Sequence, residues 1–69
     1  MSNEKNIILN GKPRSVSADT IAALKEELGI AARKVAMEKN RVVVRQADYG
    51  QTDIAEGDEI EVVEFIGGG

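Results

Sequence analysis

The sequence predicts a single α+β domain in which a hairpin, one helix and three further strands follow one another. Three observations carry this prediction. The chain has 69 residues, which leaves room for one domain only. Asn10-Gly11 follows an apolar run, the strongest short-range signal for a β-hairpin. One segment, beginning after Asp19, has apolar residues at helical spacing.

The first hairpin is expected to span residues 5–17. Its first strand covers residues 5–10 and contains Ile7, Ile8 and Leu9. Its second strand is short, over residues 14–17, with Val16 pointing inward. Pro13 stands at the start of this strand, a position that suits an edge strand because proline has no backbone N–H to donate.

The helix follows directly. Asp19 is expected to cap its first turn, since a carboxylate accepts hydrogen bonds from the free N–H groups there. One apolar stripe faces the core: Ile21, Leu24 and Leu28. Three charged residues are expected on the outer side: Lys25, Glu26 and Glu27. Gly29 can end the helix in the left-handed conformation.

The second half of the chain predicts three strands and a loop. A strand over residues 35–38, with Val35 and Met37 on one face, turns at Asn40-Arg41 into a short strand over residues 42–44. Residues 45–53 are expected to form a loop. The turn Glu56-Gly57-Asp58 then leads into a last strand over residues 59–65.

The last strand alternates in a way that leaves two apolar residues on the wrong face. Ile60 and Val62 share the core side, whereas Glu59 and Glu61 point outward. Continued alternation places Val63 and Phe65 beside the glutamates, where they form a small exposed apolar patch. The alternative is that the strand twists or bulges and Phe65 turns back into the core.

Missing residue types exclude several functions. The chain has no Cys and no His, so disulfides, thiolate nucleophiles, cysteine metal sites and the commonest general base are absent. No apolar run approaches the roughly 20 residues that span a bilayer, which argues against a membrane protein. The polar N-terminal residues are unlike a secretory signal. A cytoplasmic location is the default expectation.

Charge is distributed unevenly along the chain. Residues 1–45 hold all nine basic and five acidic residues, a net charge of +4, and residues 46–69 hold seven acidic and no basic residues. Without a basic patch, and with Tyr49 and Phe65 as the only aromatic residues, binding to nucleic acid is not expected. The acidic region favours either a basic protein partner or simply a solvated face.

No arrangement of side chains predicts an active site. Ser15 and Ser17 have no base to activate them. The carboxylate pairs Glu26-Glu27 and Glu59-Glu61 lie on expected solvent faces. The acidic residues between positions 53 and 59 do not match the spacing of a calcium loop, and Asn10-Gly11-Lys12 lacks the glycine framework of a phosphate-binding loop. The chain is therefore not expected to be an enzyme or to bind a metal or cofactor.

The end of the chain is the exception. Three glycines, Gly67, Gly68 and Gly69, follow the last strand, so residues 1–66 are expected to form the domain and residues 67–69 a flexible tail. A tail without Cβ atoms can thread a narrow channel and deliver its carboxylate to the active site of another protein. ATP can activate such a carboxylate as an acyl-adenylate, which a sulfur or amine nucleophile attacks. The alternative is a frayed terminus of no function.

These residues resemble the ThiS-type family of ubiquitin-like sulfur carriers. The resemblance covers nearly the whole chain, and its most specific part is the run from Gly57 to the end, which closes with IEVVEFIGGG. The opening Ile7-Ile8-Leu9-Asn10-Gly11 and the strand Val35-Ala36-Met37-Glu38 fit the same pattern. The resemblance implies a β-grasp fold, a mixed sheet of four to five strands around one main helix.

The resemblance also implies a function and partners. An E1-like adenylyltransferase would activate Gly69 with ATP, a sulfur donor such as a cysteine desulfurase would convert it to a thiocarboxylate, and thiazole synthase would take the sulfur for thiamine. The tail would thread through Gly67 and Gly68. The docking surface would comprise apolar and acidic residues of the last strand: Glu61, Val63, Glu64, Phe65 and Ile66. Family members need only Gly-Gly, so the third glycine moves the carboxylate by one residue.

Other functions remain open from the sequence. A carrier for molybdopterin or cysteine synthesis would have the same tail, and so would a ubiquitin-like protein modifier, which forms isopeptide bonds. A simple binding module would not need the tail. An enzyme acting alone would have to show turnover by the isolated chain.

Overall fold

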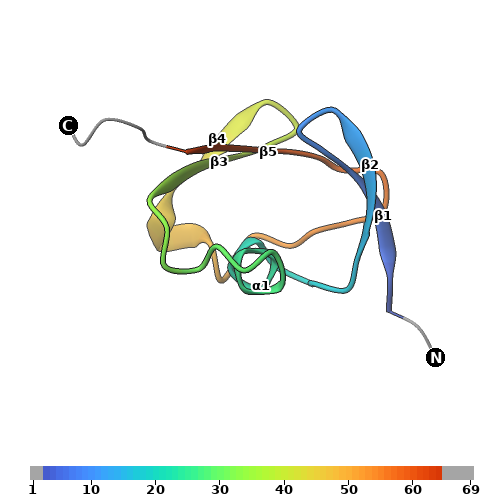
Figure 1. Cartoon of the computed structure of the whole chain (residues 1–69), viewed down its shortest axis with the longest axis horizontal. Helices are drawn as coiled ribbons and strands as arrows, with labels where there is room; N and C mark the ends of the chain where they lie inside the picture. Colours follow the sequence, from blue (N-terminus) through green and yellow to red (C-terminus); the bar gives the residue numbers. More distant parts are fainter. Residues whose placement is uncertain (1–2, 65–69) are drawn as a thin grey trace.

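A mixed five-stranded sheet curves over one helix (Figure 1). The computed structural model describes residues 3–64. Along the chain the elements are β1 (Lys5–Leu9), β2 (Lys12–Val16), α1 (Ile21–Glu27), β3 (Val35–Lys39), β4 (Val42–Val44), the 3-10 helix η1 (Gln46–Asp48) and β5 (Glu59–Glu64). This order confirms the α+β architecture that the sequence predicts, with η1 added.

The sheet has the order β2-β1-β5-β3-β4. The central strands β1 and β5 run parallel, with Ile8 opposite Glu59 and Leu9 opposite Ile60. The other pairs, β1–β2, β3–β4 and β3–β5, are antiparallel. The last strand of the chain therefore lies in the middle of the sheet, where neighbours on both sides fix its position.

Both predicted hairpin turns are confirmed, and the asparagine of each turn also forms a hydrogen bond with β5. Asn10, Asn40 and Arg41 have positive φ angles of 51°, 50° and 71°, as tight two-residue hairpin turns require. The Asn10 Oδ1 atom also accepts a hydrogen bond from the backbone N–H of Val62 at 2.8 Å. The Asn40 Oδ1 atom accepts one from the N–H of Glu59 at 2.9 Å. The two turns thus hold β5 from opposite sides.

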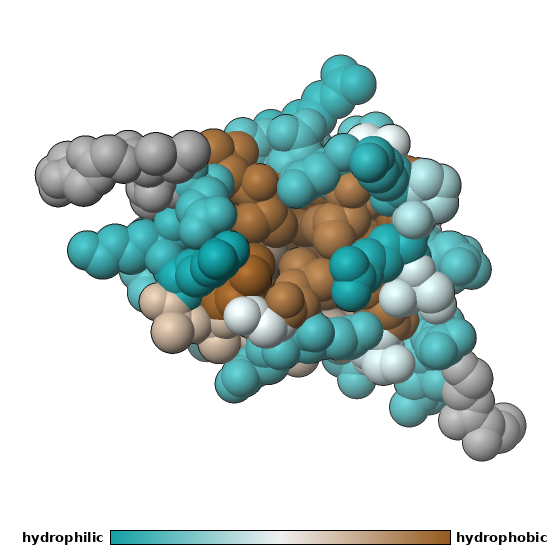
Figure 2. Space-filling view, in the orientation of Figure 1, coloured by the Kyte–Doolittle hydropathy of each residue, from teal (hydrophilic) through white to brown (hydrophobic). Residues whose placement is uncertain are grey.

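The core lies between the sheet and α1. Among residues 3–64 it consists of nine buried residues: Ile7, Val16, Ala18, Ile21, Leu24, Met37, Tyr49, Ile54 and Ile60. Of the residues predicted to point inward, Val16, Ile21, Leu24, Met37 and Ile60 are among them, whereas Leu28, Val35 and Val62 are only partly buried against this core. Tyr49 and Ile54 come from segments that the sequence did not assign to a helix or strand. Figure 2 shows that apolar side chains remain visible between the two layers on one side of the molecule. The core is thin and open there.

The helix cap differs from the prediction. Thr20 is the N-cap residue, and its Oγ1 atom accepts a hydrogen bond from the N–H of Ala23 at 3.1 Å. Asp19 instead forms an ion pair with the ammonium group of Lys5, the first residue of β1, at 2.6 Å. The predicted end of the helix is confirmed, because Gly29 has a φ of +74° and donates its N–H to the Glu26 carbonyl.

Two further predictions were wrong, one about the side chain of Lys25 and one about the segment of residues 45–53. Lys25, expected on the solvent side of the helix, is only 9% exposed. Residues 45–53 do not form a simple loop, since they contain η1 and bring Tyr49 into the core. The carbonyls of Tyr49 and Thr52 accept hydrogen bonds from the N–H groups of Ala22 and Ile21. This segment packs against the start of α1 and covers Lys25.

The turn before β5 depends on one carboxylate. Gly57 has a φ of +85°, and Asp58 accepts hydrogen bonds from the N–H of Ala55 at 2.8 Å and from the Asn40 amide at 3.1 Å. Burial raises the pKa of Asp58. These hydrogen bonds and the Lys39 ammonium at 3.6 Å lower the pKa by more than burial raises it, so the net pKa lies below its ordinary value of 3.8. The folded state therefore favours the ionised carboxylate.

This shift predicts how stability depends on pH. Because the folded pKa of Asp58 is below the unfolded one, its contribution is fully present above about pH 4 and is lost as the pH falls through the folded pKa. We expect Asp58→Asn to lower the free energy of unfolding at pH 7. The difference in unfolding free energy between the wild type and this variant should become smaller as the pH falls to 3. Urea unfolding at pH 7, 5, 4 and 3 measures this. Glu61→Gln, which removes the same charge from an exposed position, is the control; an equal pH effect there contradicts the assignment.

Candidate functional site

The candidate site is the C-terminal half of β5, which leads to the predicted tail. On one side β3 accompanies it to its end, with Val35 opposite Glu64. On the other side the pairing with β1 ends at Ile60, and the Asn10 side chain takes over at Val62. The chain therefore reaches the predicted tail from the middle of the sheet, from a strand that the fold holds on both sides as far as Val62.

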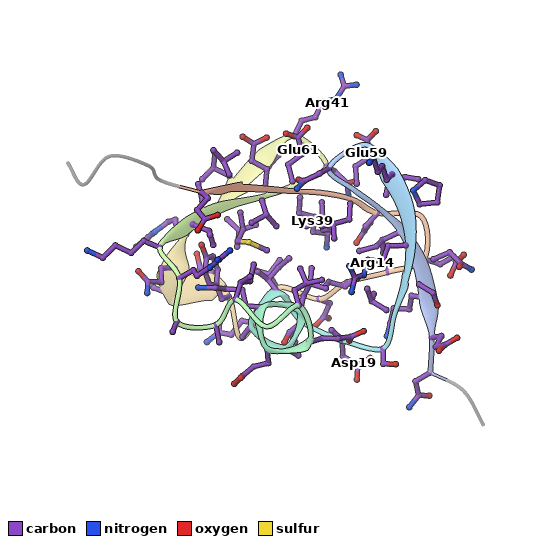
Figure 3. The ribbon with its side chains drawn as sticks, in the orientation of Figure 1. Arg14, Asp19, Lys39, Arg41, Glu59 and Glu61 are labelled. Atoms are coloured by element: carbon purple, nitrogen blue, oxygen red, sulfur yellow. The ribbon has the colours of Figure 1, made fainter. Side chains whose placement is uncertain are left out.

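The outer face of the sheet carries the predicted docking residues Glu61 and Val63. Figure 3 shows Glu59, Glu61 and Arg41 projecting from the sheet on the side away from α1, while Lys39 points toward the helix layer. Val63 is 46% exposed and lies opposite Ala36. Its exposure confirms that alternation continues through Val63. The alternative for Phe65 is not decided, because that residue lies outside the described range.

This face combines apolar and acidic side chains. Val43 on β4 is 63% exposed and lies opposite Glu38, which in turn lies opposite Glu61. Two carboxylates directly opposite each other in a sheet repel, so this pair does not stabilise the fold. Neither Glu38 nor Glu61 has an ion-pair partner within residues 3–64. An apolar patch bordered by unpaired acids suits a partner surface of apolar and basic residues.

Glu64 is separated from this face. It alternates with Val63 and lies on the opposite side of the sheet, where it lines a hollow of about 220 Å³ together with Val62. Its carboxylate lies 3.4 Å from Nη1 of Arg33. The structure thus brings Glu61 and Val63 together but not Glu64. The remaining predicted site residues, Phe65, Ile66, Gly67, Gly68 and Gly69, lie outside the described residues.

The acidic residues near the turn before β5 form hydrogen bonds and an ion pair within the domain. Glu56 accepts hydrogen bonds from the backbone and side-chain nitrogens of Asn6 at 2.9 and 3.2 Å. Asp58 closes its own turn, and Glu59 lies 3.8 Å from Arg41. Residues 3–64 contain no group of three or more acidic side chains placed to hold a metal ion. In the same range, no helix has the length and apolarity needed to cross a membrane.

Comparison with known proteins agrees with this architecture. The crystal structure of the thiamine biosynthesis protein ThiS from Geobacter metallireducens superposes with a TM-score of 0.79 at 34% identity, covering 93% of this chain and 99% of that one. Its solution structure gives a TM-score of 0.75 at 32% identity, over 93% of this chain and 87% of that one. The sheet order, the single helix and this likeness define a β-grasp protein.

The family follows from the sequence match. The model of the ThiS family matches residues 7–69, and the chain belongs to that family. It is also 45% identical over 64 residues to a thiazole synthase of Paramagnetospirillum magneticum and 48% identical over 64 residues to one of Magnetococcus marinus. In both cases the match covers 91% of this chain but only 20% of the relative. The chain therefore spans about one fifth of the length of these thiazole synthases.

Proposed function

We propose that this chain is a sulfur carrier in thiamine biosynthesis. The observation that carries the proposal is its membership of the ThiS family over residues 7–69, together with a likeness to a ThiS protein that covers nearly the whole of both chains. The predicted glycine tail supplies the chemical group that such a carrier requires. The chain would act as a substrate of its partner enzymes and not as an enzyme.

The proposed chemistry takes place at the carboxylate of Gly69. An E1-like adenylyltransferase joins this carboxylate to the α-phosphate of ATP, and pyrophosphate leaves. A persulfide sulfur, carried by a donor such as a cysteine desulfurase, attacks the carbonyl carbon and AMP leaves. A thiol then attacks the donor's sulfur and forms a disulfide with it, and the broken sulfur–sulfur bond leaves the thiocarboxylate on Gly69. This chain supplies only the carboxylate and the surface that positions it.

Thiazole synthase is the proposed acceptor of the sulfur. In the two bacterial relatives, a segment similar to this chain is part of a polypeptide named thiazole synthase. Covalent linkage raises the effective concentration of one domain near the other, often to the millimolar range, and is useful when the two must meet repeatedly. This arrangement favours thiamine biosynthesis over the other pathways in which such carriers act.

Intact mass measurement tests the proposal. The chain is incubated with ATP, cysteine, a cysteine desulfurase and an E1-like adenylyltransferase, and its mass is then compared with that of the untreated chain. We expect a gain equal to the replacement of one oxygen by sulfur, and fragmentation should place the change on Gly69. An unchanged mass, while an established carrier is converted in the same mixture, would overturn the proposal.

The outer face of β5 yields a prediction about docking. Val63→Asp places a charge on the exposed apolar side chain of β5 nearest the predicted tail, so we expect the Kd for the adenylyltransferase to rise about tenfold or more. Unfolding free energy should fall by no more than about 1 kcal/mol, because Val63 lies outside the core. Calorimetric titration and urea unfolding measure the two effects.

Val42→Asp is the matched control. Val42 is 66% exposed, but it lies opposite Lys39 at the far end of the β3–β4 pairing from Val35 and Glu64. The same change of side chain there should leave Kd within about twofold. Equal weakening by both variants would mean that negative charge in general, and not the patch around Val63, governs docking.

A further inference from the structure

Lys25 is a buried cation for which the fold provides no counter-ion. It lies in the last turn of α1 and is only 9% exposed. Its ammonium group donates one long hydrogen bond, 3.4 Å, to the Arg33 carbonyl, and it lies 5.4 Å from the centre of the Tyr49 ring. Within residues 3–64 no carboxylate lies within ion-pair distance of it. Burying a charge without an opposite charge is unfavourable, and an ammonium group has three N–H donors to satisfy.

A pocket lies beside this ammonium group. Its volume is about 350 Å³, and it is formed by α1, the segment after α1 and the segment around η1. The residues that line it are Lys25, Ala31, Ala32, Arg33, Lys34, Val35, Gln46 and Tyr49. Three of these are cations and none is an acid, in a chain whose net charge is −3. A concave surface with charges of one sign concentrates oppositely charged ligands.

The other two cations remain accessible. Arg33 and Lys34 are exposed. Arg33 shares one guanidinium nitrogen with Glu64 at 3.4 Å, which leaves its remaining N–H groups available. Lys34 has no hydrogen-bond or ion-pair partner among the described residues. Ala31 and Ala32, whose side chains are small, line the same pocket as Tyr49.

We propose that this pocket binds a phosphate group, with Lys25 as the buried anchor and Arg33, Lys34 and the Gln46 amide as donors around it. Charge-assisted hydrogen bonds from ammonium and guanidinium groups are the interactions that hold phosphate most strongly. The volume exceeds that of inorganic phosphate, so pyrophosphate is the better first probe. The proposal concerns residues remote from the tail and does not depend on the sulfur-carrier function.

The test uses the full chain labelled with ¹⁵N and titrated with pyrophosphate at constant ionic strength. We expect saturable shifts of the amide signals of residues 31–35 and of the Gln46 side chain. Lys25→Met keeps a long apolar side chain in the buried position but removes the charge, and it should weaken binding at least tenfold. Lys12→Met removes a charge from an exposed position on β2 and should leave binding within twofold.

Three outcomes would overturn the proposal. Shifts that rise linearly without saturating would mean that there is no site. Saturation that is unchanged in Lys25→Met would show that the anion binds elsewhere. Equal saturation by sodium acetate would show that the pocket does not select phosphate. Should Lys25→Met fail to fold, Lys34→Gln removes an exposed cation from the same pocket and is expected to weaken binding about threefold.

Discussion

Removal of Gly68 and Gly69 is expected to abolish thiocarboxylate formation without changing the stability of the domain. Among residues 3–64 the last core residue is Ile60 and the last strand ends at Glu64, and Gly68 comes four positions later in the sequence. Their loss draws the terminal carboxylate back by about 7 Å, since an extended residue spans roughly 3.3–3.6 Å. A carboxylate displaced this far cannot reach an ATP held in the active site of the adenylyltransferase.

The measurement combines intact mass after the conversion reaction with urea unfolding. Deletion of Ser2 and Asn3, which removes two residues from the other end, is the control and should leave both conversion and stability unchanged. The same pair of variants separates the classes of function. A carrier or a protein modifier loses its activity with the glycines, whereas a binding module keeps its affinity for its partner. A truncated chain that still gains sulfur would contradict the role assigned to the tail.

Local signals in the sequence were sufficient for the strands and turns. The φ angles of Asn10 and Asn40 are positive because a two-residue hairpin turn requires them, and asparagine tolerates that conformation well. Strict alternation placed Ile60 in the core and left Val63 exposed. Each of these features depends on residues adjacent in sequence, which is why pattern and propensity predicted them.

Features that depend on distant residues were not predictable in this way. The helical pattern of apolar residues places Lys25 on the solvent side of the helix, but the side chain is buried, with residues 31–34 and Tyr49 around it. Asp19 and Thr20 are both good capping residues; Thr20 caps the helix, while Asp19 pairs with the Lys5 ammonium 14 positions away. The hydrogen bonds from the Val62 N–H to Asn10 and from the Glu59 N–H to Asn40 also join residues that are distant in the sequence. For the same reason the basic pocket leaves no signal in the sequence.

Leu24→Ala is expected to cost more stability than any surface substitution considered above. Leu24 is fully buried between α1 and the sheet. Truncation of a buried leucine lowers the free energy of unfolding by about 2–5 kcal/mol, through lost apolar burial and the cavity left behind. A domain of this length has a total stability of about 3–10 kcal/mol, so the variant should lose about a fifth of its stability or more.

Because the core is thin, it cannot easily repack to reduce the loss of stability in Leu24→Ala. In the part of the chain that the structure describes, only nine residues form the core, and the hydrogen bonds of the two asparagine turns hold β5 in place above it. Neighbouring side chains therefore have little freedom to fill a cavity. Leu28→Ala, the same substitution at the half-buried end of the helix, is the matched control and should cost clearly less. Urea unfolding followed by circular dichroism and by the emission of Tyr49, the chain's one tyrosine, measures both variants. Equal losses at the two positions would mean that the helix, and not the core beneath Leu24, limits the stability of the domain.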